Sequence, residues 1–286
     1  MSRLSEWLAN GPLISDGAWG TELQARGLEP GAAPDNWNLT HPDRVEAVAR
    51  AYVEAGSQVL LTNTFRANAI AMEGELLAIN RAGVAISRRA AEGRALVFAS
   101  IGPTGRMLMA GDISPEQASA AFAAQAAALA GAGADALLVE TMSDIEEARL
   151  AVAAARTTGL PVIVSFAFDS GKNKDRTMMG ATPEAVAAAM VEAGADAVGA
   201  NCGVGVEYAA AICRRLHAAS DLPIWIKPNA GLPKMEGTAV RYDVSAESFA
   251  AHYASLCDAG ASFLGGCCGS TPDFIRALVV ARCASS

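Results

Sequence analysis

The segment LAGAGADALLVET (129–141) contains the pattern that decides the fold. An alanine-rich helical stretch ends at glycine, and a short apolar run follows directly. Glycine suits the left-handed conformation that ends many helices, and a run of roughly four to eight apolar residues suits a strand buried on both faces. The same pattern recurs in YVEAGSQVLLTNTF (52–65), MVEAGADAVGANC (190–202) and CDAGASFLGGCC (257–268).

Apolar runs of this kind are spaced along the whole chain, at 12–17, 58–64, 95–102, 136–141, 161–168, 196–202, 223–229 and 262–268. Most gaps between them hold a helix-length stretch, so consecutive strands must run parallel, joined by crossovers. Eight such units in about 250 residues predict a (β/α)8 barrel. An open doubly wound sheet would fit the alternation too, but the first run leads into DGAWGTE (16–22) rather than a glycine-rich dinucleotide turn. No linker or low-complexity tract interrupts the pattern, so we expect one domain over residues 1–286.

Composition excludes several classes of partner. The formal net charge is −8, and no basic stripe is present, which argues against nucleic acid or an anionic membrane surface. No apolar run reaches the roughly 18 residues of a membrane span. The first residues, MSRLSEWLANGPLIS, lack the apolar core of a signal peptide, so we expect a cytoplasmic protein.

Polar and reactive residues gather where the predicted strands end. Because the carboxyl ends of parallel barrel strands meet at one mouth, we expect these side chains to converge there. Asp and Asn are common turn residues, which is the alternative explanation for any one of them. The residues concerned are Asp16, Asn63, Glu140, Asn201, Cys202, Asn229, Cys267 and Cys268.

Three of the six cysteines form a candidate metal site. Cys202 ends the sixth predicted strand, and Cys267 and Cys268 end the eighth. Three thiolates with one position left open are typical of a catalytic zinc site, and thiolates favour zinc over magnesium or manganese. Buried apolar cysteines are one alternative, which we prefer for the remaining cysteines Cys213, Cys257 and Cys283 on helical stretches. A vicinal disulfide between Cys267 and Cys268 is the other, which a reducing compartment disfavours.

A zinc ion with three thiolate ligands favours a particular chemistry. Its complex is already anionic, so it would polarise a carbonyl or activate water poorly. It would instead stabilise a further thiol as a thiolate at neutral pH while leaving that sulfur nucleophilic. The pattern therefore indicates alkyl transfer to the sulfur of a substrate.

Eight motifs, in order along nearly the whole chain, resemble the homocysteine S-methyltransferase family. That family includes the betaine–homocysteine methyltransferases and the homocysteine domain of cobalamin-dependent methionine synthase. The resemblance implies a (β/α)8 barrel whose zinc binds homocysteine and whose product is methionine. The motifs are DGAWGTELQARG (16–27), WNLTHPD (37–43), NTFRAN (63–68), GPTG (102–105), ETMSD (140–144), GANCGVG (199–205), KPNAG (227–231) and GGCCGST (265–271).

The resemblance also implies roles for individual residues. Cys202, Cys267 and Cys268 match the zinc ligands, and as such they and Glu140 are the expected catalytic group. Asp16 and Glu140 match acidic positions that hold the amino group of homocysteine, beside the backbone of Gly17 and Ala18. Asn229 matches a residue able to occupy the open metal position before substrate arrives. The alternatives are a helix-capping turn carboxylate for Asp16 and a structural ion pair for Glu140.

The methyl donor is less constrained. A quaternary ammonium such as glycine betaine needs ring faces, which Trp19, Trp37 and Phe65 would supply, although these three could equally be ordinary packing residues. The loop SGKNKDRTMMG (170–180) could bind a donor carboxylate or be solvated. Thr141 stands where the animal betaine enzymes have Tyr, which weakens the match. We expect betaine, with another onium of the S-methylmethionine type as an alternative.

A corrinoid donor is the alternative nearest to betaine. No histidine of the chain lies in an Asp-x-His-x-x-Gly pattern, so a corrinoid would arrive on a separate protein. Two further alternatives assign the chain a function other than methyl transfer. Lys227, on the same strand face as Asn229, could form a Schiff base, and zinc could merely staple strands of a non-catalytic barrel. The sequence leaves the oligomeric state open.

Overall fold

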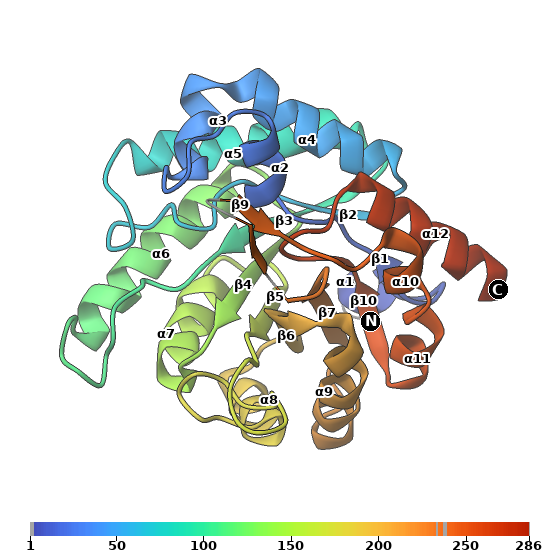
Figure 1. Cartoon of the computed structure of the whole chain (residues 1–286). Coiled ribbons are helices and arrows are strands. Elements are labelled where there is room, and N and C mark those ends of the chain that lie inside the picture. The colour runs from blue at the N-terminus through green and yellow to red at the C-terminus, as the bar shows by residue number, and fades with distance from the viewer. Residues whose placement is uncertain (1–2, 233, 237–238, 286) are drawn as a thin grey trace.

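The computed structural model describes residues 3–232, 234–236 and 239–285 and shows the expected barrel (Figure 1). Within these residues, eight parallel strands pair in the order β1-β10-β7-β6-β5-β4-β3-β2. A bridge between Ser15 and Val59 joins the two ends of this order. The strands are β1 (Leu13–Ile14), β2 (Val59–Leu61), β3 (Leu96–Ile101), β4 (Ala136–Met142), β5 (Val162–Phe166), β6 (Ala197–Gly205), β7 (Ile224–Asn229) and β10 (Ala261–Leu264).

Helices surround the strands, as Figure 1 shows. The last helix, α12, contacts α4 and so completes the ring. The helices are α1 (Arg3–Trp7), α2 (Gly20–Ala25), α3 (Trp37–Thr40), α4 (Pro42–Glu54), α5 (Leu76–Ala91), α6 (Pro115–Gly131), α7 (Ile145–Arg156), α8 (Pro183–Ala193), α9 (Val206–Ala219), α10 (Ala246–Ala250), α11 (Tyr253–Asp258) and α12 (Pro272–Ser285), with a 3-10 turn η1 (Pro34–Asn36). None of the helices in the described ranges combines the length and apolar character that a membrane-crossing segment requires.

The Gly-Ala-Asp stretches at 133–135 and 194–196 follow helix ends, as the sequence predicts, and their aspartates also bind a neighbouring strand. Gly194 ends α8 at φ +80°, a left-handed conformation that favours glycine. The aspartates that follow the glycines then bind the neighbouring strand. Asp135 Oδ2 accepts the N–H of Val97 at 2.7 Å, and Asp196 Oδ2 accepts that of Val162 at 2.8 Å. The repeat therefore ends each helix and also ties the start of one strand to the next.

The amino-terminal end of the barrel is filled by aromatic side chains. Phe98, Trp225 and Phe263 lie inside the strands, with ring centroids 5.3 to 6.0 Å apart. Trp7 of α1 packs on Phe98 with its ring tilted by 40° and the centroids 5.5 Å apart, and it covers this group. This end is a packed core, so the other end, where the strands terminate, is left for chemistry.

Two strand ends differ from the prediction. The last strand stops at Leu264, so Gly265 to Cys268 lie in a loop rather than in the predicted run 262–268. The sixth strand instead continues past Cys202 to Gly205, with an irregularity between these two residues. A hairpin of β8 (Lys234–Glu236) and β9 (Ala239–Arg241) also follows β7 within the described residues, and no sequence signal indicated it.

Candidate active site at the barrel mouth

A cavity of about 480 Å³ opens at the carboxyl ends of the strands. Most of the residues predicted for the site line it: Gly17, Ala18, Trp19, Phe65, Glu140, Cys202, Cys267 and Cys268. Among the described residues, Asp16, Trp37 and Asn229 are not part of its wall. The topology therefore brings the cysteines, one acid and two aromatic rings to one space.

The three cysteines meet at this cavity. Their Sγ atoms all lie within 4.8 Å of one another, and those of Cys202 and Cys268 are 3.9 Å apart. Irregular backbone makes this possible, because Cys202 adopts φ +57° and the two other cysteines lie beyond the end of β10. All six cysteines of the chain lie in the described ranges and are free thiols, so Cys267 and Cys268 form no vicinal disulfide.

The loop that holds Cys267 and Cys268 is tied to β7 by backbone hydrogen bonds. The N–H of Cys267 donates to the carbonyl of Pro228 at 2.8 Å, and the N–H of Ala230 donates to the carbonyl of Cys268 at 3.0 Å. Asn229 lies between these two bonds. Its Nδ2 is 3.4 Å from the Gly203 carbonyl oxygen, and its buried Oδ1 has no hydrogen-bond partner among the described residues.

The donor set fits a soft divalent cation. Contact with the Cys202 thiol, and then burial, raise the pKa of Cys267 well above that of a free thiol. Three thiolates this close together therefore require a cation, and thiolates select zinc among the common divalent ions. Each cysteine is only partly buried, so the side of the cluster toward the cavity stays accessible to another ligand. The orphaned oxygen of Asn229, beside the cysteine loop, is a further candidate ligand atom.

Glu140 lies near the end of β4, and each oxygen of its carboxylate accepts a hydrogen bond. Ser100 Oγ donates to its Oε1 at 2.5 Å, and Asn201 Nδ2 donates to its Oε2 at 3.2 Å. Burial raises the pKa of this carboxyl, while the charge of Lys227 and the Ser100 hydrogen bond oppose the rise. Glu140 thus faces the cavity as a buried acid whose ionised form has three supporting neighbours.

Asp16 lies beneath the cavity wall, paired with Lys227. It is 0% exposed, and its carboxylate accepts from Lys227 Nζ at 2.5 Å, Trp19 Nε1 at 2.8 Å and the N–H of Leu61 at 2.7 Å. The predicted contact between Asp16 and an amino group stays a prediction, with three donors already around the carboxylate. Lys227 is held in an ion pair, so it is not the free amine that the Schiff-base alternative needs.

Two of the three aromatic residues predicted for the donor pocket lie at the cavity. Trp19 precedes α2 and Phe65 follows β2, and both line the cavity. Trp37 is buried in the core outside the cavity wall, with its ring centroid 4.6 Å from that of His41 and 5.2 Å from the Arg44 guanidinium. Among the described residues, the loop 170–180 lies outside the cavity wall and pairs with itself through Ser170 and Arg176.

Sequence reasoning missed several residues of the site. Asp35, in η1, lines the cavity although it is only 1% exposed, and burial raises its pKa to about 6. Ser100 and Tyr242 also line it, as does Lys227, which the sequence analysis considered only for a Schiff base. Asp35 lies outside every motif and predicted strand of the sequence analysis, and Ser100 lies within a predicted strand, so no sequence pattern marked either residue.

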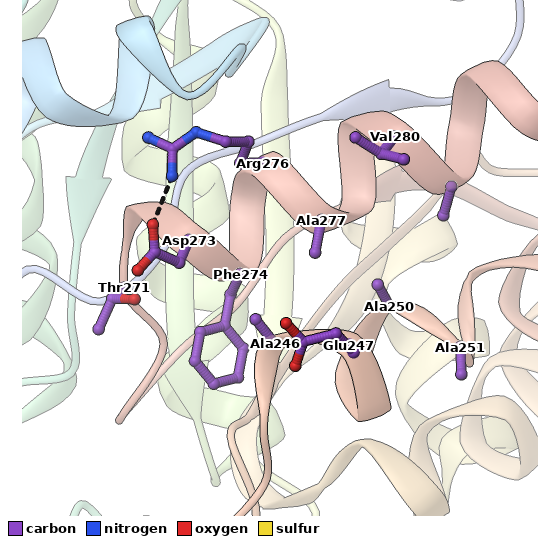
Figure 2. A pocket seen from close by; sticks show the side chains of 11 residues that line it. Ala246, Glu247, Ala250, Ala251, Thr271, Asp273, Phe274, Arg276, Ala277 and Val280 are labelled. Atoms are coloured by element: carbon purple, nitrogen blue, oxygen red, sulfur yellow. Dashed lines mark hydrogen bonds and ion pairs between the residues drawn. The ribbon is translucent and has the colours of Figure 1, made fainter.

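A second hollow, of about 740 Å³, lies between α10 and α12. Figure 2 shows its small side chains, among them Ala246, Ala250 and Ala277, and the ion pair of Asp273 with Arg276. It contains neither a cysteine nor any residue predicted for the site. The chemistry therefore belongs to the mouth.

Comparison with known proteins agrees with this geometry. The sequence model of the homocysteine S-methyltransferase family matches residues 13–281, almost the entire chain. The chain belongs to this family. In this homocysteine S-methyltransferase family member, the matched region includes all three clustered cysteines and Glu140.

Individual relatives support the assignment. The chain is 32% identical to methionine synthase of Mycobacterium leprae and 31% identical to that of Mycobacterium tuberculosis, over 98% and 97% of its own length. It spans only 25% of the length of each of these enzymes. The homocysteine methyltransferase MmuM from Escherichia coli, in its metallated form, is 26% identical with a TM-score of 0.80, and the similarity covers 98% of this chain and 99% of that one.

Proposed function

We propose that this chain transfers a methyl group to the sulfur of homocysteine and so forms methionine. The observation that carries the proposal is the cluster of Cys202, Cys267 and Cys268 at the wall of a cavity that also contains Glu140. Zinc bound by the three cysteines would hold the incoming thiol as a thiolate at neutral pH. Free thiols at the site suit the reducing cytoplasm, where we place this activity.

The residues of the chain would orient the acceptor. Glu140 accepts the ammonium group of homocysteine, because its ionised form is supported by Ser100, Asn201 and Lys227. The backbone of Gly17 and Ala18 forms the adjoining wall. Asp16 keeps Lys227 in place through their ion pair, and any contact of Asp16 with the amino group is part of the same proposal.

For the donor we propose an onium compound, with glycine betaine first. Trp19 and Phe65 offer ring faces at the cavity, and the buried carboxyl of Asp35 lies on the same wall. Aromatic faces and a carboxylate both attract a cation that has lost its water. The new S–C bond forms as the donor's bond to the methyl carbon breaks, and the neutral amine or thioether leaves with that electron pair.

A corrinoid protein is the second candidate for the donor. The similarity to two methionine synthases favours this donor. Each of them is about four times as long as this chain, so the matching region is accompanied there by further polypeptide that could carry a cofactor. In that case the corrinoid protein would dock at the rim of the cavity and pass its methyl group to the homocysteine sulfur, and no aromatic pocket for an onium donor would be needed. A non-catalytic zinc-stapled barrel is disfavoured by the cavity of about 480 Å³ beside the cysteines.

The test is a methyl-transfer assay with zinc-loaded protein and homocysteine. Glycine betaine, S-methylmethionine and methylcobalamin are offered separately, and methionine and the demethylated donor are quantified. We expect methionine with betaine, loss of this activity in Cys268→Ser and full activity in Cys283→Ser, whose thiol is exposed on α12. Turnover with methylcobalamin alone would overturn the donor. X-ray absorption that shows no additional sulfur at zinc after homocysteine is added would overturn the acceptor chemistry.

A further inference from the structure

The side chain of Asn201 connects the two halves of the proposed acceptor site. It is 2% exposed and lies between Glu140 of β4 and the cysteine loop after β10. Its Nδ2 is 3.2 Å from Glu140 Oε2 and 4.0 Å from Cys267 Sγ, and it donates to Thr141 Oγ1 at 2.7 Å.

The orientation of the Asn201 amide is fixed by its neighbours. The N–H of Thr141 can only donate, and it lies 2.8 Å from Asn201 Oδ1, so this atom must be the oxygen. Ser165 Oγ donates to the same oxygen at 2.5 Å. The NH₂ group therefore faces Glu140 and Cys267, where an amide donor favours a carboxylate and a thiolate.

Backbone strain at both ends of this contact indicates that the arrangement is held in place. Thr141 has φ +62° and Cys202 has φ +57°, and each is next to a residue of the Asn201–Glu140 pair. A positive φ is especially unfavourable for a β-branched residue such as threonine. Such conformations persist where surrounding contacts impose them, and the Asn201 amide contacts both the N–H and the hydroxyl of Thr141.

We propose that Asn201 is a positioning residue that aligns the ammonium-binding Glu140 with the metal-binding Cys267, so that the chain selects a thiol that carries an amino group at the right distance. This inference rests on the proposed function, because it assumes that homocysteine binds through its sulfur and its ammonium group. Asn201 itself need not touch the substrate.

The experiment compares two thiols by calorimetric titration of zinc-loaded protein. Homocysteine carries the amino group, and 4-mercaptobutyrate is the same molecule without it. In Asn201→Leu, which has the same branched shape but no donor, we expect the preference for homocysteine to fall by roughly 10- to 100-fold, the range of one charge-assisted hydrogen bond. Binding of 4-mercaptobutyrate should change less than about threefold.

Ser165→Ala is the matched control, because it removes a partner of Oδ1 and leaves the NH₂ group facing Glu140. It should keep the wild-type preference. Asn201→Ser provides a smaller substitution if the leucine variant does not fold. A cycle with Glu140→Gln adds a second criterion, since the two effects on homocysteine affinity should not add.

The outcomes are distinguishable. If zinc-loaded wild-type protein binds no homocysteine, the proposed function fails before any variant is made. If the wild type prefers homocysteine and both Asn201 variants keep that preference, only the role of Asn201 is overturned. Equal loss of affinity for both thiols would also overturn it, because the amide would then act on the metal site alone.

Discussion

Two buried carboxylates at the mouth are stabilised in different ways. Asp16 has the Lys227 ammonium at 2.5 Å and two further donors. Asp35 accepts the backbone N–H of Arg66 at 2.8 Å, and among the described residues no side-chain nitrogen of a lysine or arginine forms an ion pair with it. A buried charge without a partner weakens the native state. The ionised form of Asp35 therefore lowers the stability of the native state, which is typical of a carboxylate at a functional cavity.

Replacing Asp35 with Asn should reveal this cost as a function of pH. Burial raises the Asp35 pKa from 3.8 to about 6, so between these pH values the native state keeps a proton that the unfolded state has released. Native stability contributed by this group therefore falls as pH rises from about 4 to 6 and stays reduced above. We expect Asp35→Asn to be more stable than wild type at pH 7.5, by on the order of 1–3 kcal/mol, with the difference vanishing near pH 4.

Urea denaturation of both proteins at several pH values measures this difference. The amide oxygen of Asn can still accept the N–H of Arg66, so the native contact is kept. Asp273→Asn is the control, because Asp273 is exposed on α12 and its exposed ion pair contributes little. A stability difference between wild type and Asp35→Asn that is the same at pH 4 and pH 7.5 would contradict the argument.

At the scale of elements, the site depends on how closely β6 approaches β7. Gly199 of β6 faces Trp225 of β7, and a methyl group on Gly199 would collide with the Trp225 carbonyl oxygen. β6 ends in the segment that holds Cys202, and β7 is bonded to the loop that holds Cys267 and Cys268. The distance between the two strands therefore sets the distance between the sulfurs.

Gly199→Ala should consequently weaken the metal site as well as the fold. We expect a loss of about 1–3 kcal/mol in the free energy of unfolding from overpacking, together with a reduced zinc content as isolated. Gly131→Ala, at the end of α6, is the matched control, because an added methyl group meets open space there and alanine favours the helix. Metal analysis and urea denaturation check both variants. A Gly199→Ala protein with full zinc content would show that the sulfurs tolerate a strand shift.

The sequence allowed the elements to be predicted better than their contacts. The Gly-Ala-Asp repeats predicted helix ends and strand starts because they are local, and the strand count gave the barrel and the convergence of Cys202 with Cys267 and Cys268. The pairing of Asp16 with Lys227 joins residues 211 positions apart, and Asn201 acquires its role only where three strand ends meet. Trp37 was predicted to offer a ring face to the donor, but it is buried in the core beside His41 and is not part of the described cavity wall.

At the scale of the whole molecule, the cluster of three cysteines links distant parts of the barrel. Cys202 and Cys268 are 66 positions apart, and the segment between them includes β7, the hairpin, α10 and α11. A ligand that binds only the folded arrangement stabilises the whole fold. Zinc should therefore raise the melting temperature, by roughly 5 °C at a free concentration about 100-fold above its Kd.

Removal of the metal is the converse, and it provides the decisive comparison. Protein treated with a strong chelator under reducing conditions should melt at the lower temperature, and added zinc should restore the higher one. Cys268→Ser should melt near the metal-free wild type and respond weakly to zinc, whereas Cys283→Ser should behave as wild type does, because its exposed thiol lies outside the cluster. Differential scanning calorimetry measures the melting temperatures of the chelated and zinc-restored wild type and of the two variants. A zinc-dependent shift of the same size in Cys268→Ser would mean that the stabilising ion binds somewhere other than the three sulfurs. The proposal of zinc at the acceptor site would then be contradicted.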